Sequence, residues 1–368
     1  MNLLKILHTE SSRGWGGQEL RILTESKALV ERGHRISIAA PPDAPIFHKA
    51  KDLRLEVIDL PIQEKSIRGL IAIRALIKSR DFDVINTHSS TDSWLVALAC
   101  KTMFEAPRIV RTRHISTPVR PTAANRWLFG KAAARVVTTG EALRDMLVRD
   151  LALDSAYVTS VPTGVDCNLY NPVTDDEKRA LRIALGVPAD KVIVGTVCTL
   201  RLLKGLEYLF EAIRLLEDET FLLYVVGDGP QRRRLEDWIL RNSMQDMIKI
   251  VGGQNNVHEW LQCFDIFAFP SLAEGVPQAL IQAMLTELPC VTTNVGGIPE
   301  FAVNQQTAIL IPPRRPELLS SAIKSLSNDP ILSKSLGCAA RGRCKVHNSI
   351  QKMADQMEFV LTSAAKNL

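Results

Sequence analysis

The stretch Phe267–Glu300, FAFPSLAEGVPQALIQAMLTELPCVTTNVGGIPE, decides the fold of the chain. It predicts an apolar strand end over 267–270, a loop around Glu274, a helix over 277–285 and a second strand over 290–293, followed by a Gly-Gly turn. Glu274 therefore comes where a strand ends and a helix begins. In open α/β sheets this is where ligands bind.

The residues after Glu274 indicate the chemistry of that ligand. A helix that begins near Pro277 points its N–H groups and the positive end of its dipole at an anion. Gln282 lies further along the same helix, so its side chain can share a cleft with the loop. The start of a helix can bind a phosphate group, and an acidic side chain beside it can accept hydrogen bonds from hydroxyl groups. A ligand that carries both phosphates and several hydroxyls, such as a sugar nucleotide, fits this combination.

This stretch resembles the donor-site signature of the retaining glycosyltransferases of family 4, which have the two-domain GT-B fold. That signature is usually Glu, Gly, a small or apolar residue and Pro, then a second Glu eight positions after the first and Ala-Met. Here Glu274, Gly275, Val276 and Pro277 match it, but Gln282 replaces the second Glu. In the family that residue binds the nucleotide ribose. Because Gln both donates and accepts hydrogen bonds, we expect the change to tune binding and not to abolish it.

Length and composition set the outer limits. The 368 residues, 46% of them apolar and 23% charged, are typical of a globular chain and favour two domains. The seven cysteines show no metal-ligand spacing, so we expect free thiols in a reducing compartment. The start MNLLKILH is too short an apolar run for a signal peptide, and no later run is long enough to span a bilayer. These features predict a cytoplasmic protein, with peripheral attachment to the inner face of the cytoplasmic membrane as a further hypothesis.

Positive charge is concentrated in the first half of the chain. Residues 1–165 hold 24 Lys and Arg against 17 Asp and Glu. This bias is typical of a solvated surface, although it can also attract anionic lipid headgroups. We expect no nucleic-acid partner.

The first domain opens with a βαβ unit. A strand is predicted over 3–8, a Gly-rich loop over 11–18 (SSRGWGGQ), a helix over 19–32 and a strand over 35–40. The loop glycines Gly14, Gly16 and Gly17 leave room for close backbone approach to a bound group. Gly16 and Gly17 also resemble the Gly-Gly-x-Glu segment of family 4, whose loop faces the phosphates and sugar of the donor.

Two histidines follow later strands of this domain. Strands are predicted over 55–60, 83–87, 108–112 and 135–138, and their alternation with helices favours a mostly parallel sheet covered on both faces. His88 and His114 come directly after two of these strands. A hydrogen-bonded structural role is favoured for His88. His114, in RTRHIS, matches a family histidine near the transferred sugar.

Two basic segments have two interpretations. Residues 65–80, KSIRGLIAIRALIKSR, form a basic amphipathic helix, and residues 120–135 add Arg126, Trp127 and Phe129. In the first interpretation, each segment is a core helix whose basic face is exposed to solvent. In the second, each segment docks on a membrane in which a lipid carries the acceptor.

The domain crossing is predicted at VPTGVDCNLYNP, residues 161–172, where Thr163 stands in place of the family's commoner Asn. We therefore expect a first domain over 1–165, a nucleotide-sugar-binding domain over 166–348, and a helix over 349–368 that crosses back to the first domain, as in GT-B proteins.

The second domain supplies the expected cations. An apolar strand over 192–199 leads to Arg201, Lys204 and a helix, which together form a good diphosphate clamp. Lys204 matches the Lys-Gly pair of the family. The family's arginine usually lies where this chain has Thr199, so Arg201 has to supply that charge.

The remaining elements of the second domain complete the pattern. Strands are predicted at 221–226, 248–253, 265–269 and 308–312, a short helix at 257–263 and a last helix from about 350. Gly252, in a Val-Gly-Gly turn, matches a family position near the nucleotide base. Gly296, Gly297 and Glu300 resemble the family's Gly-Gly-x-x-Glu.

The resemblance implies an α/β fold of GT-B architecture, in which two Rossmann-like doubly wound domains face a central cleft. It implies transfer of a sugar from a nucleoside diphosphate donor to a hydroxyl of a glycan or lipid-linked acceptor, with retained anomeric configuration, in bacterial lipopolysaccharide or envelope polysaccharide assembly. Arg201 and Lys204 would stabilise the leaving diphosphate, an exposed Glu274 would orient sugar hydroxyls, and His114 would line the opposite wall.

Two rival functions and one cofactor question stay open. A sugar-nucleotide epimerase or hydrolase would use the same cleft without an acceptor, and a noncatalytic partner protein would only bind the ligand. A D-x-D spacing occurs once, at Asp81 and Asp83, where Asp83 opens a predicted buried strand. We therefore expect no required metal or other cofactor.

Overall fold

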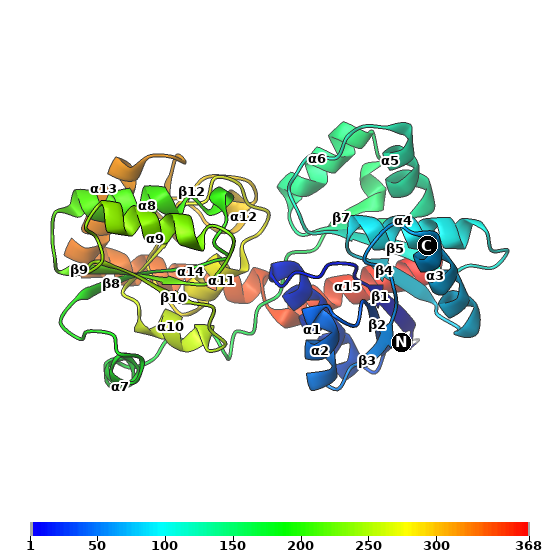
Figure 1. Ribbon diagram of the computed structural model, residues 1–368, viewed down its shortest axis with the longest axis horizontal. Helices are drawn as coiled ribbons and strands as arrows, with labels where there is room; N and C mark the ends of the chain where they lie inside the picture. The colour runs from blue at the N-terminus through cyan, green and yellow to red at the C-terminus, as the bar shows by residue number, and fades with distance from the viewer. Residues whose placement is uncertain (1–2, 367–368) are drawn as a thin grey trace. The chain divides into compact units, whose positions relative to one another are not determined.

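The computed structural model describes residues 3–366 and divides the chain into two compact units (Figure 1). The first comprises residues 1–164 and 350–368, and the second comprises residues 165–349. These limits lie within one residue of the boundaries expected from the sequence, and the last helix belongs to the first unit.

The first unit is built on a parallel sheet of seven strands in the order β3-β2-β1-β4-β5-β6-β7. Its strands are β1 Lys5–Thr9, β2 Arg35–Ala40, β3 Glu56–Asp59, β4 Val84–Thr87, β5 Arg108–Arg113, β6 Arg135–Thr138 and β7 Val158–Ser160. Its helices are α1 Gly17–Glu31, α2 Pro45–Asp52, α3 Ile67–Ser79, α4 Ser90–Lys101, α5 Ala123–Trp127, α6 Glu141–Leu151 and α15 Ile350–Ala365.

Two apolar layers sandwich this sheet. Successive strand residues point to opposite faces, so Ile6 packs with α1, α2 and α15 whereas Leu7 packs with α3, α4 and α6. Helix α15, red in Figure 1, lies along α1 and buries Met357 and Leu361 in the first layer. The prediction that the last helix belongs with the first half of the chain agrees with this packing.

The second unit has a parallel six-stranded sheet in the order β10-β9-β8-β11-β12-β13. Its strands are β8 Val192–Val197, β9 Phe221–Val226, β10 Ile248–Gly252, β11 Ile266–Phe269, β12 Cys290–Thr293 and β13 Ile309–Ile311. Its helices are α7 Asp175–Leu185, α8 Leu206–Leu216, α9 Arg232–Arg241, α10 Val257–Cys263, α11 Gln278–Leu285, α12 Ile298–Phe301, α13 Pro316–Asn328 and α14 Pro330–His347.

Local sequence explains these elements. Helix α7 begins with a capping box, in which Thr174 and Glu177 satisfy each other's backbone N–H groups, and Gly186 ends it in the left-handed conformation. On one face of the second sheet α8, α9 and α13 pack, and on the other α10, α11 and α12. Two doubly wound parallel sheets confirm the predicted fold class.

The sequence missed β7, the outermost strand of the first sheet. It has three residues and is only partly buried, so it lacks the long apolar run that identifies the other strands. Among residues 3–366, no helix combines the length and the apolar composition needed to cross a bilayer.

Candidate functional site

The second sheet has one point at which its strand order reverses. From β8 the chain continues outward to β9 and β10, and then returns to place β11 on the other side of β8. The loops that follow β8 and β11 therefore lie side by side, which is the arrangement that forms ligand sites in open α/β sheets. These loops carry Lys204 and Glu274.

Lys204 and Glu274 form an ion pair at this point. The Lys204 Nζ lies 2.5 Å from the Glu274 Oε1, which also accepts a hydrogen bond of 2.6 Å from the Ser271 hydroxyl. The same Nζ lies 5.2 Å from the centre of the Phe269 ring. The sequence placed this lysine and this carboxylate in one site, and the structure brings them into direct contact.

Backbone contacts hold the two loops together. Lys204 ends a 3₁₀ turn, Leu202–Lys204, and the Leu272 N–H donates to the Leu203 carbonyl at 2.8 Å. Gly205 has φ of +64°, and a Cβ there would lie 2.3 Å from the Pro270 carbonyl oxygen. Only glycine fits so close to the neighbouring loop. Helix α8 starts after this turn, so the cations precede the helix and do not occupy its first turn.

Glu274 is not the exposed residue that the sequence suggested. It is 8% exposed, because the loop folds beneath the Gly-Gly turn at 296–297. The Gly297 N–H donates to the Gly275 carbonyl at 3.1 Å. The carboxylate is therefore fixed by its neighbours before any ligand arrives, which reduces the reorganisation needed on binding.

Gly296→Ala is expected to disturb this loop directly. The backbone at Gly296 has φ of +55°, and an added Cβ would lie 1.9 Å from the Glu274 carbonyl oxygen. We expect a loss of about 1–3 kcal/mol in unfolding free energy, measured by urea denaturation, together with a lower transfer rate. Gly253→Ala is the matched control, because a Cβ added there would have no atom within 4 Å. Equal stability of the two variants would contradict this reading of the turn.

The other predicted donor residues lie around the same edge. Arg201 is exposed on the turn before Lys204, and within residues 3–366 it has no carboxylate within ion-pair distance. Thr199 is half-buried in the loop after β8. Gly252 ends β10 with φ of +79°, and Gln282 is 7% exposed on the second turn of α11. The structure therefore joins Lys204, and not Arg201, to Glu274.

Val276 and Pro277 connect the loop to α11. Pro277 is the N-cap residue of that helix and is buried, while Val276 and Gly275 are half-buried. The positive end of the α11 dipole thus lies beside the Glu274 loop, as the sequence predicted.

The first sheet reverses its order between β1 and β4, and a second polar cluster lies there. Glu10 follows β1 directly and is fully buried. It accepts hydrogen bonds from the Ser12 N–H at 2.7 Å, from the Gln18 side-chain amide at 2.5 Å and from the Ser89 hydroxyl. The Gly-rich loop that leads to Gly16 and Gly17 is thereby tied to the loop after β4. Glu10 was not among the predicted site residues, although a carboxylate directly after a strand was a usable signal.

Glu10→Gln is expected to change the pH dependence of stability. Burial, and then the charge of Asp92, raise the pKa of Glu10 to about 8. Between pH 4.5 and 8 the folded state keeps the Glu10 proton, whereas the unfolded state has released it. The unfolded state therefore gains stability relative to the folded state as the pH rises through this range, and the free energy of unfolding falls. Relative to the variant, the wild type should lose on the order of 1 kcal/mol per pH unit between pH 5 and 8. Urea unfolding at several pH values measures this slope, and the exposed Glu31→Gln serves as the control. Parallel curves for wild type and Glu10→Gln would contradict it.

A chain of three histidines leads to the end of β5. The Nδ1 of His8 lies 2.9 Å from the Nε2 of His88, and the Nδ1 of His88 lies 2.9 Å from the Nε2 of His114. Burial lowers the pKa of His8 to about 3 and holds the pKa values of His88 and His114 well below their usual range. Each link therefore joins neutral rings, one donating and one accepting, so His88 fixes which nitrogen of His114 carries the proton. The structural role favoured for His88 agrees with this position.

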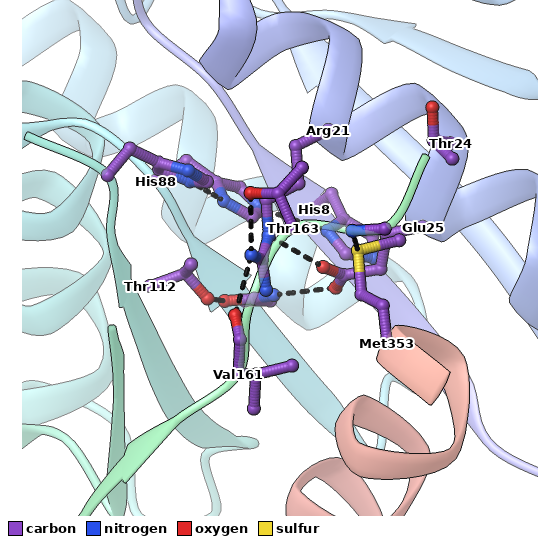
Figure 2. Close-up of polar contacts among 12 residues, drawn as sticks. His8, Arg21, Thr24, Glu25, His88, Thr112, Val161, Thr163 and Met353 are labelled. Carbon is purple, nitrogen blue, oxygen red and sulfur yellow. Dashed lines mark hydrogen bonds and ion pairs between the residues drawn. The ribbon is translucent and has the colours of Figure 1, made fainter. Parts of the chain in front are cut away.

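A buried ion pair fixes the segment that leaves the first unit. Arg21 and Glu25 lie one turn apart on α1, with Nε and Oε2 3.6 Å apart and both side chains fully buried. Arg21 donates to the Val161 carbonyl at 2.7 Å and to the Thr163 hydroxyl at 3.1 Å, as Figure 2 shows. Thr163, which departs from the family pattern, thus contacts the buried arginine.

The acidic pair at Asp81 and Asp83 contacts one lysine. The predicted strand is buried but begins at Val84, so Asp83 precedes it and is exposed. The Oδ2 of Asp83 accepts a hydrogen bond from the Lys5 N–H at 2.7 Å. Asp81 lies 3.2 Å from the Lys5 Nζ. Within the described part of the chain, no three His, Cys, Asp or Glu side chains are grouped so as to hold a metal ion.

Known proteins match both halves of the chain. A model described as "Glycosyltransferase Family 4" matches residues 15–169, and one described as "Glycosyl transferases group 1" matches residues 177–343. An Escherichia coli relative, the UDP-Gal:alpha-D-GlcNAc-diphosphoundecaprenol alpha-1,3-galactosyltransferase, is 25% identical over 284 residues, which cover 73% of this chain and 72% of the relative.

Solved structures share the fold over the whole chain. A glycosyltransferase of Rickettsia africae superposes with a TM-score of 0.87 at 20% identity and covers 100% of both chains. The Anabaena protein HepE in complex with UDP-glucose gives a TM-score of 0.85 at 20% identity, covering 98% of this chain and 100% of that one. Since the two family models together match most of each unit, this chain belongs to the GT-B glycosyltransferases of the family 4 type.

Proposed function

We propose that the protein transfers a sugar from a nucleoside diphosphate donor to a hydroxyl of a glycan or lipid-linked acceptor, with retention of anomeric configuration. The observation that carries this proposal is the Lys204–Glu274 pair at the switch point of the second sheet. A fixed cation suits a leaving diphosphate, and a fixed carboxylate suits the hydroxyls of a sugar.

The chemistry requires charge stabilisation more than an enzymic nucleophile. As the bond from the anomeric carbon to the diphosphate breaks, the phosphate oxygens gather negative charge. Lys204, with Arg201 and the positive end of α11, would stabilise that charge, and Glu274 would orient the sugar. The departing phosphate would take the proton of the acceptor hydroxyl on the same face. His114 is proposed to contact the transferred sugar.

Two relatives support the substrate class and the setting. HepE was crystallised with UDP-glucose, and the Escherichia coli relative is named for a UDP-sugar donor and a lipid diphosphate acceptor. We therefore propose a nucleotide sugar as donor, and assembly of bacterial envelope polysaccharide or lipopolysaccharide at the cytoplasmic side of the membrane as the setting. We further propose that transfer needs no metal, so excess EDTA should leave the rate unchanged.

A donor panel with and without acceptor tests this function. UDP-, GDP-, ADP- and dTDP-sugars would be incubated with the enzyme, and nucleoside diphosphate release and product configuration followed by NMR. We expect release that depends on acceptor and a product with the anomeric configuration of the donor. Release that is equal without acceptor would identify a hydrolase, and isomerisation of the free donor would identify an epimerase.

Gln282→Glu tests the departure from the family signature. A carboxylate accepts hydrogen bonds from two neighbouring ribose hydroxyls, and such charge-assisted bonds are stronger than those of an amide. We expect the KM of the donor to fall by a few-fold, measured by initial rates, while the exposed Gln245→Glu leaves it unchanged. An unchanged KM in Gln282→Glu would show that the ribose contact does not depend on this side chain.

Helix α3 supports the membrane hypothesis. Ile67 and Ile71 are 78% and 64% exposed, and Lys65, Arg68 and Lys78 are exposed beside them. The second basic segment contributes less, because Phe129 is buried. We propose that α3 touches the inner face of the membrane. Ile67→Ser with Ile71→Ser should reduce co-sedimentation with anionic vesicles, whereas the exposed Ile183→Ser on α7 should not. Equal sedimentation of wild type and variant would remove α3 from the membrane.

A further inference from the structure

The first unit contains a pocket that the donor chemistry does not use. Its volume is about 220 Å³, and three arginines line it: Arg111 and Arg113 from β5, and Arg120 from the segment before α5. Ser90, the first residue of α4, and Trp94, one turn later, also line the pocket.

The charge of this pocket is not neutralised by its lining. None of the lining residues is acidic, and within residues 3–366 no carboxylate oxygen lies within 4.0 Å of any of the three guanidinium groups. Asp92 attracts Arg111 from greater distance, but its carboxylate accepts hydrogen bonds from the Thr9 hydroxyl and the His88 N–H. One carboxylate facing three cations leaves an excess of positive charge.

Two of these arginines, the buried Arg111 and the half-buried Arg113, have hydrogen-bond donors that are not used. Arg111 is 2% exposed, donates to the Ser89 carbonyl at 3.0 Å and lies 4.5 Å from the centre of the Phe129 ring. Arg113 donates to the Thr117 carbonyl at 2.8 Å. The Nε of each is buried and has no hydrogen-bond partner among residues 3–366. Uncompensated buried cations destabilise a fold, and a bound polyanion offsets that cost.

Aromatic and basic side chains extend from the pocket toward α3. Trp94 stacks on Trp127 with ring centres 5.9 Å apart, and Lys65 and Lys101 lie over these two rings at 5.5 and 5.2 Å. Lys65 immediately precedes the helix whose Ile67 and Ile71 are exposed. An anion site thus adjoins a surface suited to an apolar chain at a membrane boundary.

We propose that this pocket binds the diphosphate of an acceptor carried on a long apolar alcohol, with the alcohol chain lying over Trp94 toward α3. This inference rests on the proposed function, because it assumes that the acceptor is lipid-linked. The diphosphate of the donor is a separate ligand, for which the second unit supplies Lys204. Arginine forks pair well with phosphate oxygens, and one diphosphate presents enough oxygens to engage all three.

Calorimetric titration of the full-length protein tests the pocket without requiring turnover. The probes are farnesyl diphosphate, farnesol, inorganic diphosphate and UDP, and a Lys204→Gln background weakens binding at the donor site. We expect farnesyl diphosphate to bind more tightly than inorganic diphosphate, and farnesol not to bind. Arg113→Gln and Arg120→Gln should each weaken farnesyl diphosphate by about tenfold. Arg126→Gln, exposed on α5 and outside the pocket, should bind like wild type.

The exposed Arg120 keeps the test valid if Arg113→Gln fails to fold. Unchanged binding of farnesyl diphosphate to Arg120→Gln would overturn the proposal that the pocket binds a lipid diphosphate. The proposal would also fail if the pocket variants bound UDP less tightly and farnesyl diphosphate as well as before. In turnover assays of enzyme with intact Lys204, the pocket variants should raise the acceptor KM and leave the donor KM unchanged. If the wild type transfers sugar and the pocket variants have the same acceptor KM as the wild type, the proposal that the pocket binds the acceptor is wrong. If the arginines bind the probe and wild type transfers nothing with any donor, the proposed function is wrong and the pocket stands.

Discussion

Replacing Lys204 with glutamine is expected to lower kcat for sugar transfer by about 1,000-fold. The Nζ of Lys204 is fixed 2.5 Å from Glu274 and 5.2 Å from the Phe269 ring, at the edge where the leaving diphosphate would develop charge. Glutamine is polar but shorter and uncharged. The variant should therefore bind the anionic donor less tightly and, at saturating donor, lose the stabilisation of the charge that develops in the transition state. Nucleoside diphosphate release at saturating donor and acceptor measures it.

The control for this substitution is Lys249→Gln, which removes an exposed charge from the same unit. That side chain donates to the Gln245 carbonyl and belongs to no ion pair within residues 3–366. Wild-type kcat in Lys204→Gln would exclude the lysine from the chemistry. Glu274→Gln should also lose transfer while keeping the volume of the side chain. Glu274→Ala should in addition lower the unfolding free energy, because Glu274 is buried against Ser271 and Lys204.

Arg21→Met is expected to cost about 3 kcal/mol of unfolding free energy, measured by urea denaturation. Arg21 is 1% exposed, and its loss leaves a fully buried Glu25 carboxylate without a cation and two acceptors, Val161 and Thr163, without a donor. Burial already raises the pKa of Glu25 to about 7 despite Arg21. Without Arg21 that pKa rises further, so the folded state holds a proton more tightly. The loss should therefore be larger at pH 8 than at pH 6.

A matched pair of variants separates this effect from a general helix effect. Lys27→Met breaks the exposed pair with Glu31 on the same helix, and it should change stability by less than about 0.5 kcal/mol. Adding Glu25→Leu to Arg21→Met should recover part of the loss, since it removes the unpaired charge. A single Arg21→Met variant as stable as Lys27→Met would show that the buried pair contributes little.

The sequence was sufficient for the site built from adjacent loops. Lys204 and Glu274 each follow an apolar strand, and parallel strands end at the same edge of a sheet, so their proximity follows once the strands are recognised. The Gly-Gly turn that buries Glu274 was also visible in the sequence. The burial of Glu274 could not be predicted from that turn, because it depends on how the turn packs on the Glu274 loop.

The polar cluster of the first unit could not be derived in the same way. His8 meets His88 because β1 pairs with β4 in a register that sets His8 opposite Asn86 and Thr9 opposite Thr87. Nothing in the local sequence of either strand specifies this register. The different positions of the two predicted cations could not be derived either: Arg201 and Lys204 share one short turn, but the turn places only Lys204 beside the Glu274 carboxylate.

The chain enters the second unit at Val165 and leaves it at Ser349, and only then supplies α15 to the first. During synthesis on the ribosome, the second unit is complete before the first has all of its parts. Until the last helix emerges from the exit tunnel, the apolar face that receives Met357 and Leu361 stays uncovered. The N-terminal half of this protein is therefore made first and finished last, and transiently exposed apolar surface of this kind favours aggregation.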